Sequence, residues 1–195
     1  EKTPHERFAG GEITTTIEGL MGDGKALQMG TSHLLQQSFP ASFDVSFQSE
    51  DGTAKTPWCT SWGATTRLIG ALVMVHGDEK GLVLPPRIAS TQVVIVPIGA
   101  KDDLINAKAE AHELASLLRQ AGVRVLVDDN DAQRPGAKFF HWEMRGVPLR
   151  IELGMRDIAA GTCIVARRVL SEGQSAKETL PLAGLTETIQ RILEE

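Results

Sequence analysis

The second half of the chain alternates short apolar runs with a helical segment, and this pattern constrains the fold more than any other feature. Residues 92–98 and 123–127 are apolar and rich in β-branched side chains, which is typical of buried strands. Strands joined through a helix predict a sheet with helices packed on it. On the connecting helix, predicted over residues 102–120, the apolar side chains that share one face are Ala107, Ala111, Leu114 and Leu118.

Further elements are predicted towards the end of the chain. Gly122 stands where a helix-terminating glycine belongs. The remaining predicted elements are a helix over residues 135–144, strands over 148–153 and 163–167, and a last helix over 182–193. The second half therefore predicts a mixed-sheet α/β domain.

The first half has a different character, because it is rich in Gly, Thr and Ser. Two β-type runs occupy residues 12–18 and 43–47, and Asp51–Gly52 after the second run predicts a hairpin turn. Residues 66–76 are almost continuously apolar, which predicts a buried helix. Pro85–Pro86 ends regular structure and marks the expected boundary between the two halves.

Length and composition allow two domains, which we expect over residues 1–88 and 89–195. The chain has 195 residues, of which 42% are hydrophobic and 23% charged, as in ordinary globular proteins. Two cysteines are too few for a disulfide framework or a four-cysteine zinc site, so an intracellular protein is expected. The apolar runs are too short to span a bilayer. Because the chain begins with Glu rather than Met, we expect its start to be a cut.

The net charge of −5 argues against a protein that simply coats nucleic acid. One stretch has the opposite sign of net charge, since residues 134–168 contain seven Lys or Arg and three Asp or Glu. A basic stretch of this kind suits a localised site for an anionic partner. On composition alone, an ordinary solvated surface is the better interpretation.

Two segments of the first half carry candidate chemistry. Residues 30–33, Gly-Thr-Ser-His, place hydroxyls and an imidazole beside a small residue, which suits close approach of a small polar ligand. Residues 60–67 combine Gly63 with Arg67, a side chain able to hold a phosphate or stack on a base. Taken alone, the first is better interpreted as a loop with a hydrogen-bonded histidine, and the second as a glycine-containing turn before a helix. His76 and Asp78 lack partners at metal-site spacing, so no metal site is expected.

Taken together and in order, several segments resemble the prolyl-tRNA synthetase family of class II aminoacyl-tRNA synthetases. The matching segments are KTPHERFAGGE, TIEGLMGDGKALQMGTSH, WCTSWGATTRLIGALVMVHGDEKGLVLPPRIA, QVVIVPIG, DDNDAQRPGAKFFHWEMRGVPLRIELGMRD and KETLPLAGL. The resemblance covers nearly the whole chain. It is to the type without an inserted editing domain, because KTPHERF and TSH both lie within a stretch of about thirty residues.

The resemblance implies a fold and a reaction. Residues 1–88 would be the C-terminal part of an antiparallel-sheet catalytic domain, including class II motif 3, and residues 89–195 an anticodon-binding domain. Proline would attack the α-phosphate of ATP to give prolyl-adenylate, and tRNA(Pro) would then accept the prolyl group. Mg2+ would accompany ATP, and the complete enzyme is expected to be a cytoplasmic homodimer that binds no membrane.

The resemblance also implies roles for individual residues. Arg67 would be catalytic and would bind ATP together with Gln28 and Thr31. The residues that would line the proline pocket are Phe8, His33, Ser61 and Gly63. The residues that would read the anticodon are Asp129, Arg134, Lys138 and Glu143, because such side chains can bond to guanine edges. Asn130 departs from the family, which commonly has Arg at that position.

Class II motifs 1 and 2 do not occur in this sequence, so we expect a fragment that is inactive by itself. The main alternative is a synthetase-like paralogue that binds tRNA or a protein partner without catalysis. A further alternative is histidyl, threonyl or glycyl specificity, since those relatives share the architecture of the second domain. The TSH and TSWG segments favour proline.

Overall fold

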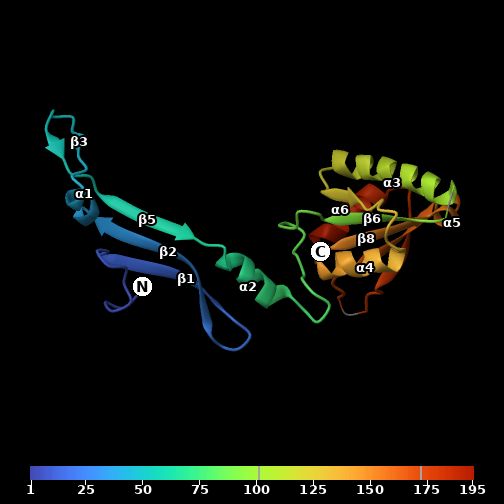
Figure 1. Cartoon of the computed structure of the whole chain (residues 1–195), viewed down its shortest axis with the longest axis horizontal. Helices are drawn as coiled ribbons and strands as arrows, with labels where there is room; N and C mark the ends of the chain where they lie inside the picture. Colours follow the sequence, from blue (N-terminus) through green and yellow to red (C-terminus); the bar gives the residue numbers. More distant parts are fainter. Residues whose placement is uncertain (101, 172) are drawn as a thin grey trace. The chain divides into compact units, whose positions relative to one another are not determined.

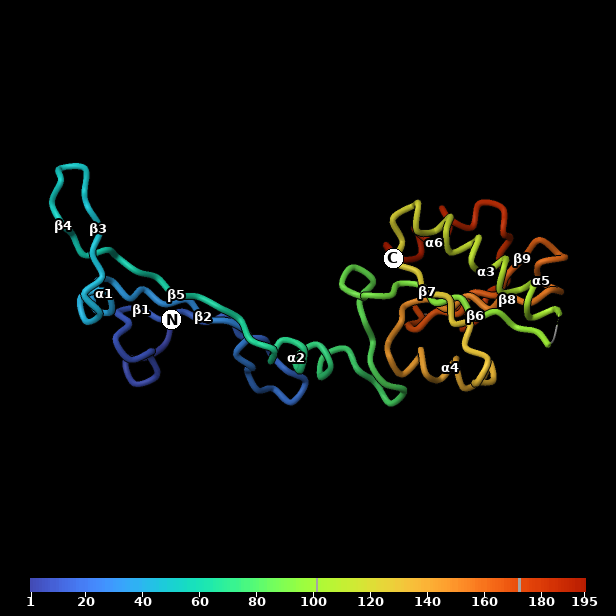
Figure 2. Tube along the Cα trace, turned by 45° about the horizontal axis from the view of Figure 1, so that its top comes forward, coloured from blue at the N-terminus to red at the C-terminus, as the bar shows by residue number. Residues whose placement is uncertain are grey.

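The computed structural model describes residues 1–100, 102–171 and 173–195. The chain forms two compact units, Glu1–Val75 and His76–Glu195 (Figures 1 and 2). Residues 76–88 pack with the second unit, so the structural division lies before the boundary expected at 88/89. That boundary, as a division between functional domains, stays a prediction.

A three-stranded antiparallel sheet forms the centre of the first unit. Its strands are β1 (Ile13–Leu20), β2 (Ala26–Gln36) and β5 (Cys59–Ala64), in the order β1-β2-β5. The strand predicted over residues 12–18 is confirmed as β1. The segments interpreted alone as a loop and a turn, residues 30–33 and 60–63, lie inside β2 and β5. Their pairing with distant segments outweighs the weak strand preference of glycine.

A short helix and a hairpin separate β2 from β5. Helix α1 (Ser38–Ser42) is followed by the paired strands β3 (Phe47–Gln48) and β4 (Ala54–Lys55). The turn predicted at Asp51–Gly52 is confirmed, whereas the strand predicted over 43–47 is wrong except for Phe47. The backbone at Asp44 has a φ of 53°, and this left-handed conformation interrupts an extended chain.

Helix α2 (Arg67–His76) confirms the predicted helix but not its burial. Ala71 is the only buried residue of this helix, while Ile69 and Met74 are 64% and 66% exposed. A continuous apolar run favours burial only where neighbouring elements cover all its faces. The described residues do not provide that cover.

The second unit is a five-stranded mixed sheet with helices on both faces, which confirms the predicted α/β class. The strand order is β10-β9-β8-β6-β7, with β6 parallel to β7 and β8 and the other pairs antiparallel. The elements are β6 (Val93–Ile98), α3 (Asp102–Gln120), β7 (Val125–Val127), α4 (Pro135–Met144), β8 (Leu149–Gly154), α5 (Met155–Ala159), β9 (Thr162–Arg167), β10 (Lys177–Pro181) and α6 (Leu185–Glu194). Of these, α5 and β10 are not predicted by the sequence.

The core of this unit lies on both sides of β6. Val93 and Ile95 pack with residues of α3 and α6, whereas Val94 and Val96 pack with residues of α4. Figures 1 and 2 show α3 and α4 on opposite faces of the sheet. Burial on both faces explains why the sequence of β6 is continuously apolar rather than alternating. The predicted face of α3 is buried, and Gly122 follows this helix with a φ of 84°.

Candidate functional site

The predicted proline and ATP residues gather on one face of the first unit's sheet. In its register Thr31 pairs with Gly63, and His33 pairs with Ser61. Side chains of directly paired residues project from the same face of an antiparallel sheet. Because residues 31 and 33 are two apart on β2, these four positions share that face.

A β-bulge brings Gln28 to the same face. The register between β1 and β2 shifts so that Ile17 pairs with Gly30 and Glu18 pairs with Gln28, which leaves Met29 as the extra residue. In a regular strand, Gln28 and Thr31 would point to opposite faces because they are three residues apart. The bulge changes that parity, and the sequence alone contains no signal for it.

Arg67 completes this group from the first turn of α2. Its Nη1 donates a hydrogen bond to the carbonyl oxygen of Gln28 over 3.4 Å. The residues that line the adjoining cavity of about 100 Å³ are Gln28, Met29, Gly30, Thr31, Gly63, Ala64, Thr65 and Arg67. All three residues expected to bind ATP therefore lie at one recess, and Gly63 is the only residue expected to bind proline that joins them there.

Phe8 and His33 form the other end of this face. Their ring centroids are 4.9 Å apart, and His33 Nδ1 lies 2.9 Å from Thr14 Oγ1. The Thr14 hydroxyl accepts a hydrogen bond from the Phe8 backbone N–H, so it can donate its own proton to His33 Nδ1. Thr14 is buried and absent from the sequence-based candidates, and its pairing with His33 is visible only in the strand register.

The four predicted anticodon residues lie along α4 and the loop before it. Arg134 is the N-cap of α4, and Glu143 lies in its last turn. Glu143 is nine positions after Arg134, and at about 1.5 Å per residue the two backbone positions are about 13 Å apart. Asp129 and Arg134 therefore lie near the beginning of α4 and Glu143 near its end, so the four residues do not form one cluster.

Lys138 is buried in the middle of α4. Its Nζ donates to the Asp128 carbonyl oxygen over 2.7 Å and lies 3.3 Å from Asp128 Oδ1. Trp142 Nε1 donates to the other carboxylate oxygen of Asp128 over 2.7 Å. This buried pair anchors the loop that precedes α4. Asp128 and Trp142 are missing from the sequence-based candidates, although they belong to the DDND and FFHWE stretches.

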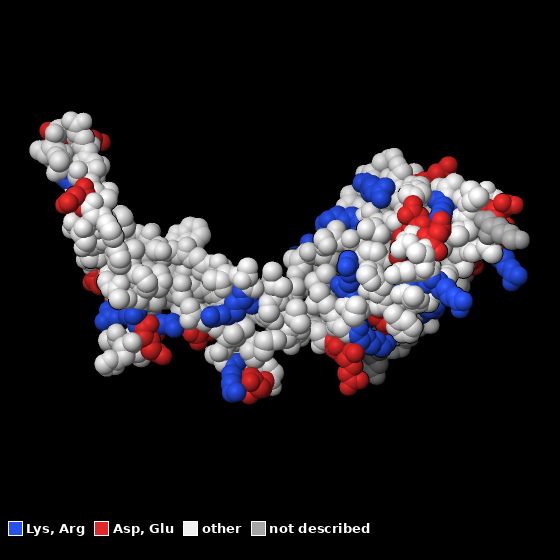
Figure 3. Space-filling model, in the orientation of Figure 1, with Lys and Arg blue, Asp and Glu red and all other residues white. Residues whose placement is uncertain are grey.

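Asp129 and Arg134 are exposed near the beginning of α4. Asp129 Oδ2 lies 3.2 Å from His112 Nε2, which projects from α3. Asn130 accepts a hydrogen bond from the Ala132 backbone N–H, so its side chain shapes the loop. On the face displayed in Figure 3, the basic side chains of the second unit are interspersed with acidic ones.

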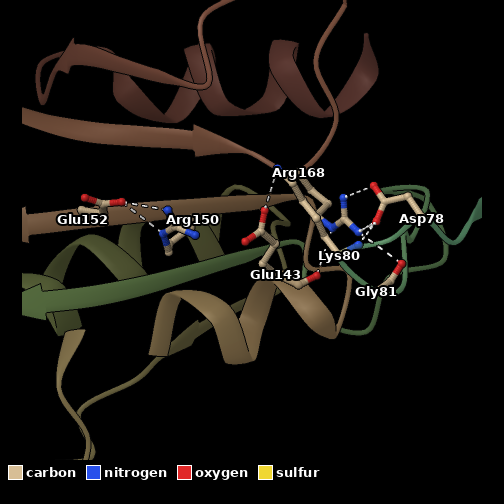
Figure 4. A network of polar contacts seen from close by, with 7 residues as sticks. All are labelled: Asp78, Lys80, Gly81, Glu143, Arg150, Glu152 and Arg168. Atoms are coloured by element: carbon tan, nitrogen blue, oxygen red, sulfur yellow. Dashed lines mark hydrogen bonds and ion pairs between the residues drawn. The ribbon is translucent and has the colours of Figure 1, made fainter. Parts of the chain in front are cut away.

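Glu143 lies beside a polar network at the other end of α4. Its carboxylate is 3.3 Å from Lys80 Nζ, and its backbone carbonyl accepts a hydrogen bond from Arg168 (Figure 4). An adjoining cavity of about 230 Å³ is also lined by Arg150 and Lys177, both of which pair with the buried Glu152. Two carboxylates thus offset part of the positive charge of this cavity.

Among the described residues, two kinds of feature are absent: a helix that could cross a membrane and a cluster of side chains that could hold a metal ion. Within residues 1–100, 102–171 and 173–195, no helix has the length and apolar character needed to cross a membrane. Over the same ranges, His, Cys, Asp and Glu side chains do not gather in groups of three or more that could hold a metal ion.

Comparisons with known proteins match both units. Residues 92–192 match the family described as anticodon binding domain. The chain is 54% identical over 181 residues, 93% of its length, to a proline–tRNA ligase of Chloroherpeton thalassium, and covers 37% of that protein. It is 49% identical over its whole length to proline–tRNA ligase 2 of Rhodococcus jostii, covering 40% of that protein. It is 47% identical over 194 residues to a proline–tRNA ligase of Chloroflexus aggregans, again covering 40%.

Proposed function

The chain belongs to the anticodon binding domain family, and we propose that it is part of a proline–tRNA ligase. The observation that carries the proposal is the similarity to proline–tRNA ligases, which extends over both units at 47–54% sequence identity. The chain spans about two fifths of the length of these curated relatives. The activity therefore concerns a longer protein, to which this chain contributes the anticodon-binding domain and the C-terminal part of the catalytic domain.

In the first step, ATP binds at the recess formed by Gln28, Thr31 and Arg67. The Arg67 guanidinium is planar and permanently charged, so it can stack on adenine or hold phosphate oxygens. Proline's carboxylate attacks the α-phosphate, forming a new P–O bond as pyrophosphate leaves. The protein accelerates this step by positioning the reactants and stabilising charge, without a covalent nucleophile. Mg2+ would enter with ATP.

Proline binds at the other end of the same sheet face. The Phe8 ring and the His33 imidazole supply a wall for the pyrrolidine ring, and Ser61 adds a hydroxyl. The Thr14 hydroxyl can donate a hydrogen bond to His33 Nδ1, which would hold the imidazole ring in place beside Phe8. Gly63 leaves open space above the strand, because no atom lies within 4 Å of a Cβ built there.

The second unit recognises the anticodon of tRNA(Pro), which contains two adjacent guanines. Asp129 and Glu143 can accept from the Watson–Crick edge of guanine, and Arg134 can donate to its O6 and N7. Lys138 supports this surface indirectly by holding the loop at Asp128. The complete enzyme is expected to be a cytoplasmic homodimer.

Pyrophosphate exchange by the complete enzyme tests the proposed function. Exchange between pyrophosphate and ATP should depend on proline and should not be supported by threonine, glycine or histidine. Charging should then be selective for tRNA(Pro). Exchange with one of the other amino acids would contradict the proposed specificity, and tRNA binding without any exchange would identify a non-catalytic paralogue.

A further inference from the structure

Residues 78–84 of the second unit lie against the C-terminal end of α4. The Leu82 backbone N–H donates to the Met144 carbonyl oxygen over 2.9 Å, and that of Leu84 donates to Gly146 over 3.2 Å. The last carbonyls of a helix have no partner within the helix. Residues 78–84, here called the capping segment, therefore supply a partner for the last carbonyl of α4 and for the residue after its C-cap.

Arg168 fastens this segment to the rest of the unit. Its Nη1 and Nη2 donate to the two carboxylate oxygens of Asp78 over 2.8 and 2.6 Å, and Nη2 also donates to the Gly81 carbonyl. Its Nε donates to the Glu143 carbonyl oxygen over 3.0 Å. The Arg168 side chain is only 3% exposed, whereas the Asp78 carboxylate that it holds is 48% exposed (Figure 4). One guanidinium thus joins the capping segment to the last turn of α4.

The backbone of the capping segment and the backbone at the end of α4 approach each other so closely that each has a glycine at the contact. A Cβ built on Gly81 would lie 2.5 Å from the Met144 carbonyl oxygen, and one on Gly146 would lie 2.5 Å from that of Leu82. Both glycines also have positive φ, 126° and 73°. The contact between α4 and the capping segment is therefore specified by the backbone as well as by Arg168.

The capping segment also touches the Glu143 side chain, through Lys80 Nζ at 3.3 Å. Both the backbone and the carboxylate of Glu143 are thereby held from outside α4. We propose that Asp78, Lys80 and Arg168 are positioning residues that hold Glu143 in the orientation needed to recognise an anticodon guanine. This inference rests on the proposed function, because it assumes that Glu143 contacts the anticodon.

The test measures binding of the 195-residue chain to two RNAs. One is the anticodon stem-loop of tRNA(Pro), and the other carries adenine in place of one anticodon guanine, each guanine being replaced in turn. The measured quantity is the discrimination ratio, the dissociation constant for the adenine-substituted RNA divided by that for the unchanged RNA. At the guanine that Glu143 contacts, Glu143→Gln should reduce this ratio by about 5- to 150-fold, the scale of a lost base-edge contact. Asp78→Asn should reduce the same ratio by about 2- to 30-fold, because it disturbs Glu143 indirectly.

Two further variants separate positioning from general loss of structure. Glu79→Gln removes the same charge from the same turn as Asp78→Asn and should leave the ratio unchanged. Lys80→Met removes only an exposed partner of Glu143, so it should lower the ratio while leaving the melting temperature close to that of the wild type. The double variant Asp78→Asn/Glu143→Gln should discriminate no less than Glu143→Gln alone, because both changes act through one side chain.

The outcomes distinguish the two proposals. If Glu143→Gln loses discrimination while Asp78→Asn and Lys80→Met keep it, the positioning role is overturned and the proposed function stands. If Glu143→Gln itself discriminates like the wild type, both the anticodon contact of Glu143 and its positioning are overturned. If the wild-type chain does not distinguish the RNAs at either guanine, anticodon recognition by this chain fails, and the positioning role fails with it.

Discussion

At the scale of single residues, Arg67 tests the proposed ATP site. In the complete enzyme, Arg67→Ala should reduce prolyl-adenylate formation by at least ~10²-fold, the scale of losing a charge stabiliser. Arg67→Lys should restore little, since an ammonium cannot reproduce a planar fork. The measurement is proline-dependent pyrophosphate exchange, with Arg87→Ala in the second unit as the control. Near-normal exchange by the lysine variant would contradict the stacking role.

Lys138 and Arg134 should behave differently, although the sequence predicts the same role for both. The Lys138 side chain is 5% exposed and pairs with Asp128, so Lys138→Ala leaves a buried carboxylate without this partner. We expect it to lower the free energy of unfolding by about 3 kcal/mol. Arg134→Ala should change that free energy by less than about 0.5 kcal/mol but weaken binding of the anticodon stem-loop. Urea unfolding measures the stability of the two variants, and RNA titration measures their affinity for the stem-loop. Equal stability of the two variants would contradict a buried, structural role for Lys138.

The pairing of Asp78 with Arg168 predicts a pH dependence of stability. Hydrogen bonds from the Arg168 guanidinium hold the pKa of Asp78 well below its ordinary value of 3.8 and raise the pKa of Arg168. A carboxyl whose pKa is lowered by folding stabilises the folded state above its unfolded pKa, and this contribution is lost as pH falls through the folded pKa. The free-energy difference between the wild type and Asp78→Asn should therefore be constant above about pH 5 and shrink below about pH 4. A difference that persists undiminished to pH 2 would contradict the pairing.

At the scale of elements, the end of α4 depends on the close approach of the capping segment. Gly81→Ala combines a positive φ with a Cβ placed against Met144, so we expect a loss of about 1–3 kcal/mol in the free energy of unfolding. Gly136→Ala, within α4 and with open space at its Cβ, should be neutral or stabilising by up to about 1 kcal/mol. Hydrogen exchange should show faster opening at residues 82–84 only in the first variant. Equal stability of both variants would mean that the segment adapts without strain.

At the scale of the whole molecule, the 195-residue chain should bind RNA but not activate proline. The cavity at Gln28, Thr31 and Arg67 is about 100 Å³, whereas pockets for small ligands are generally about 300–1,000 Å³. This recess alone is too small to enclose ATP and to preorganise charge around its phosphates. The isolated chain should therefore show no proline-dependent pyrophosphate exchange while retaining affinity for the anticodon stem-loop. Measurable exchange by the chain alone would refute this prediction.

The sequence by itself determined the elements whose signals are local. Helix α3 was predictable over its full length because its apolar positions repeat at helical spacing and Gly122 ends it. The mixed sheet followed from apolar runs joined through helices, since such runs can be buried only between layers. The candidate ATP residues Gln28, Thr31 and Arg67 came from family resemblance, and no property of the isolated segments would have grouped them.

Tertiary structure alone decided how distant segments meet. The bulge at Met29 changes which face Gln28 shares, and the pairing of Thr14 with His33 depends on a register set between two strands. Lys138 is a charged residue that is buried in the folded structure, where Asp128 lies beside it. Strand register and the pairing of buried charges depend on residues far apart in the chain, so short-range periodicity carries no information about them.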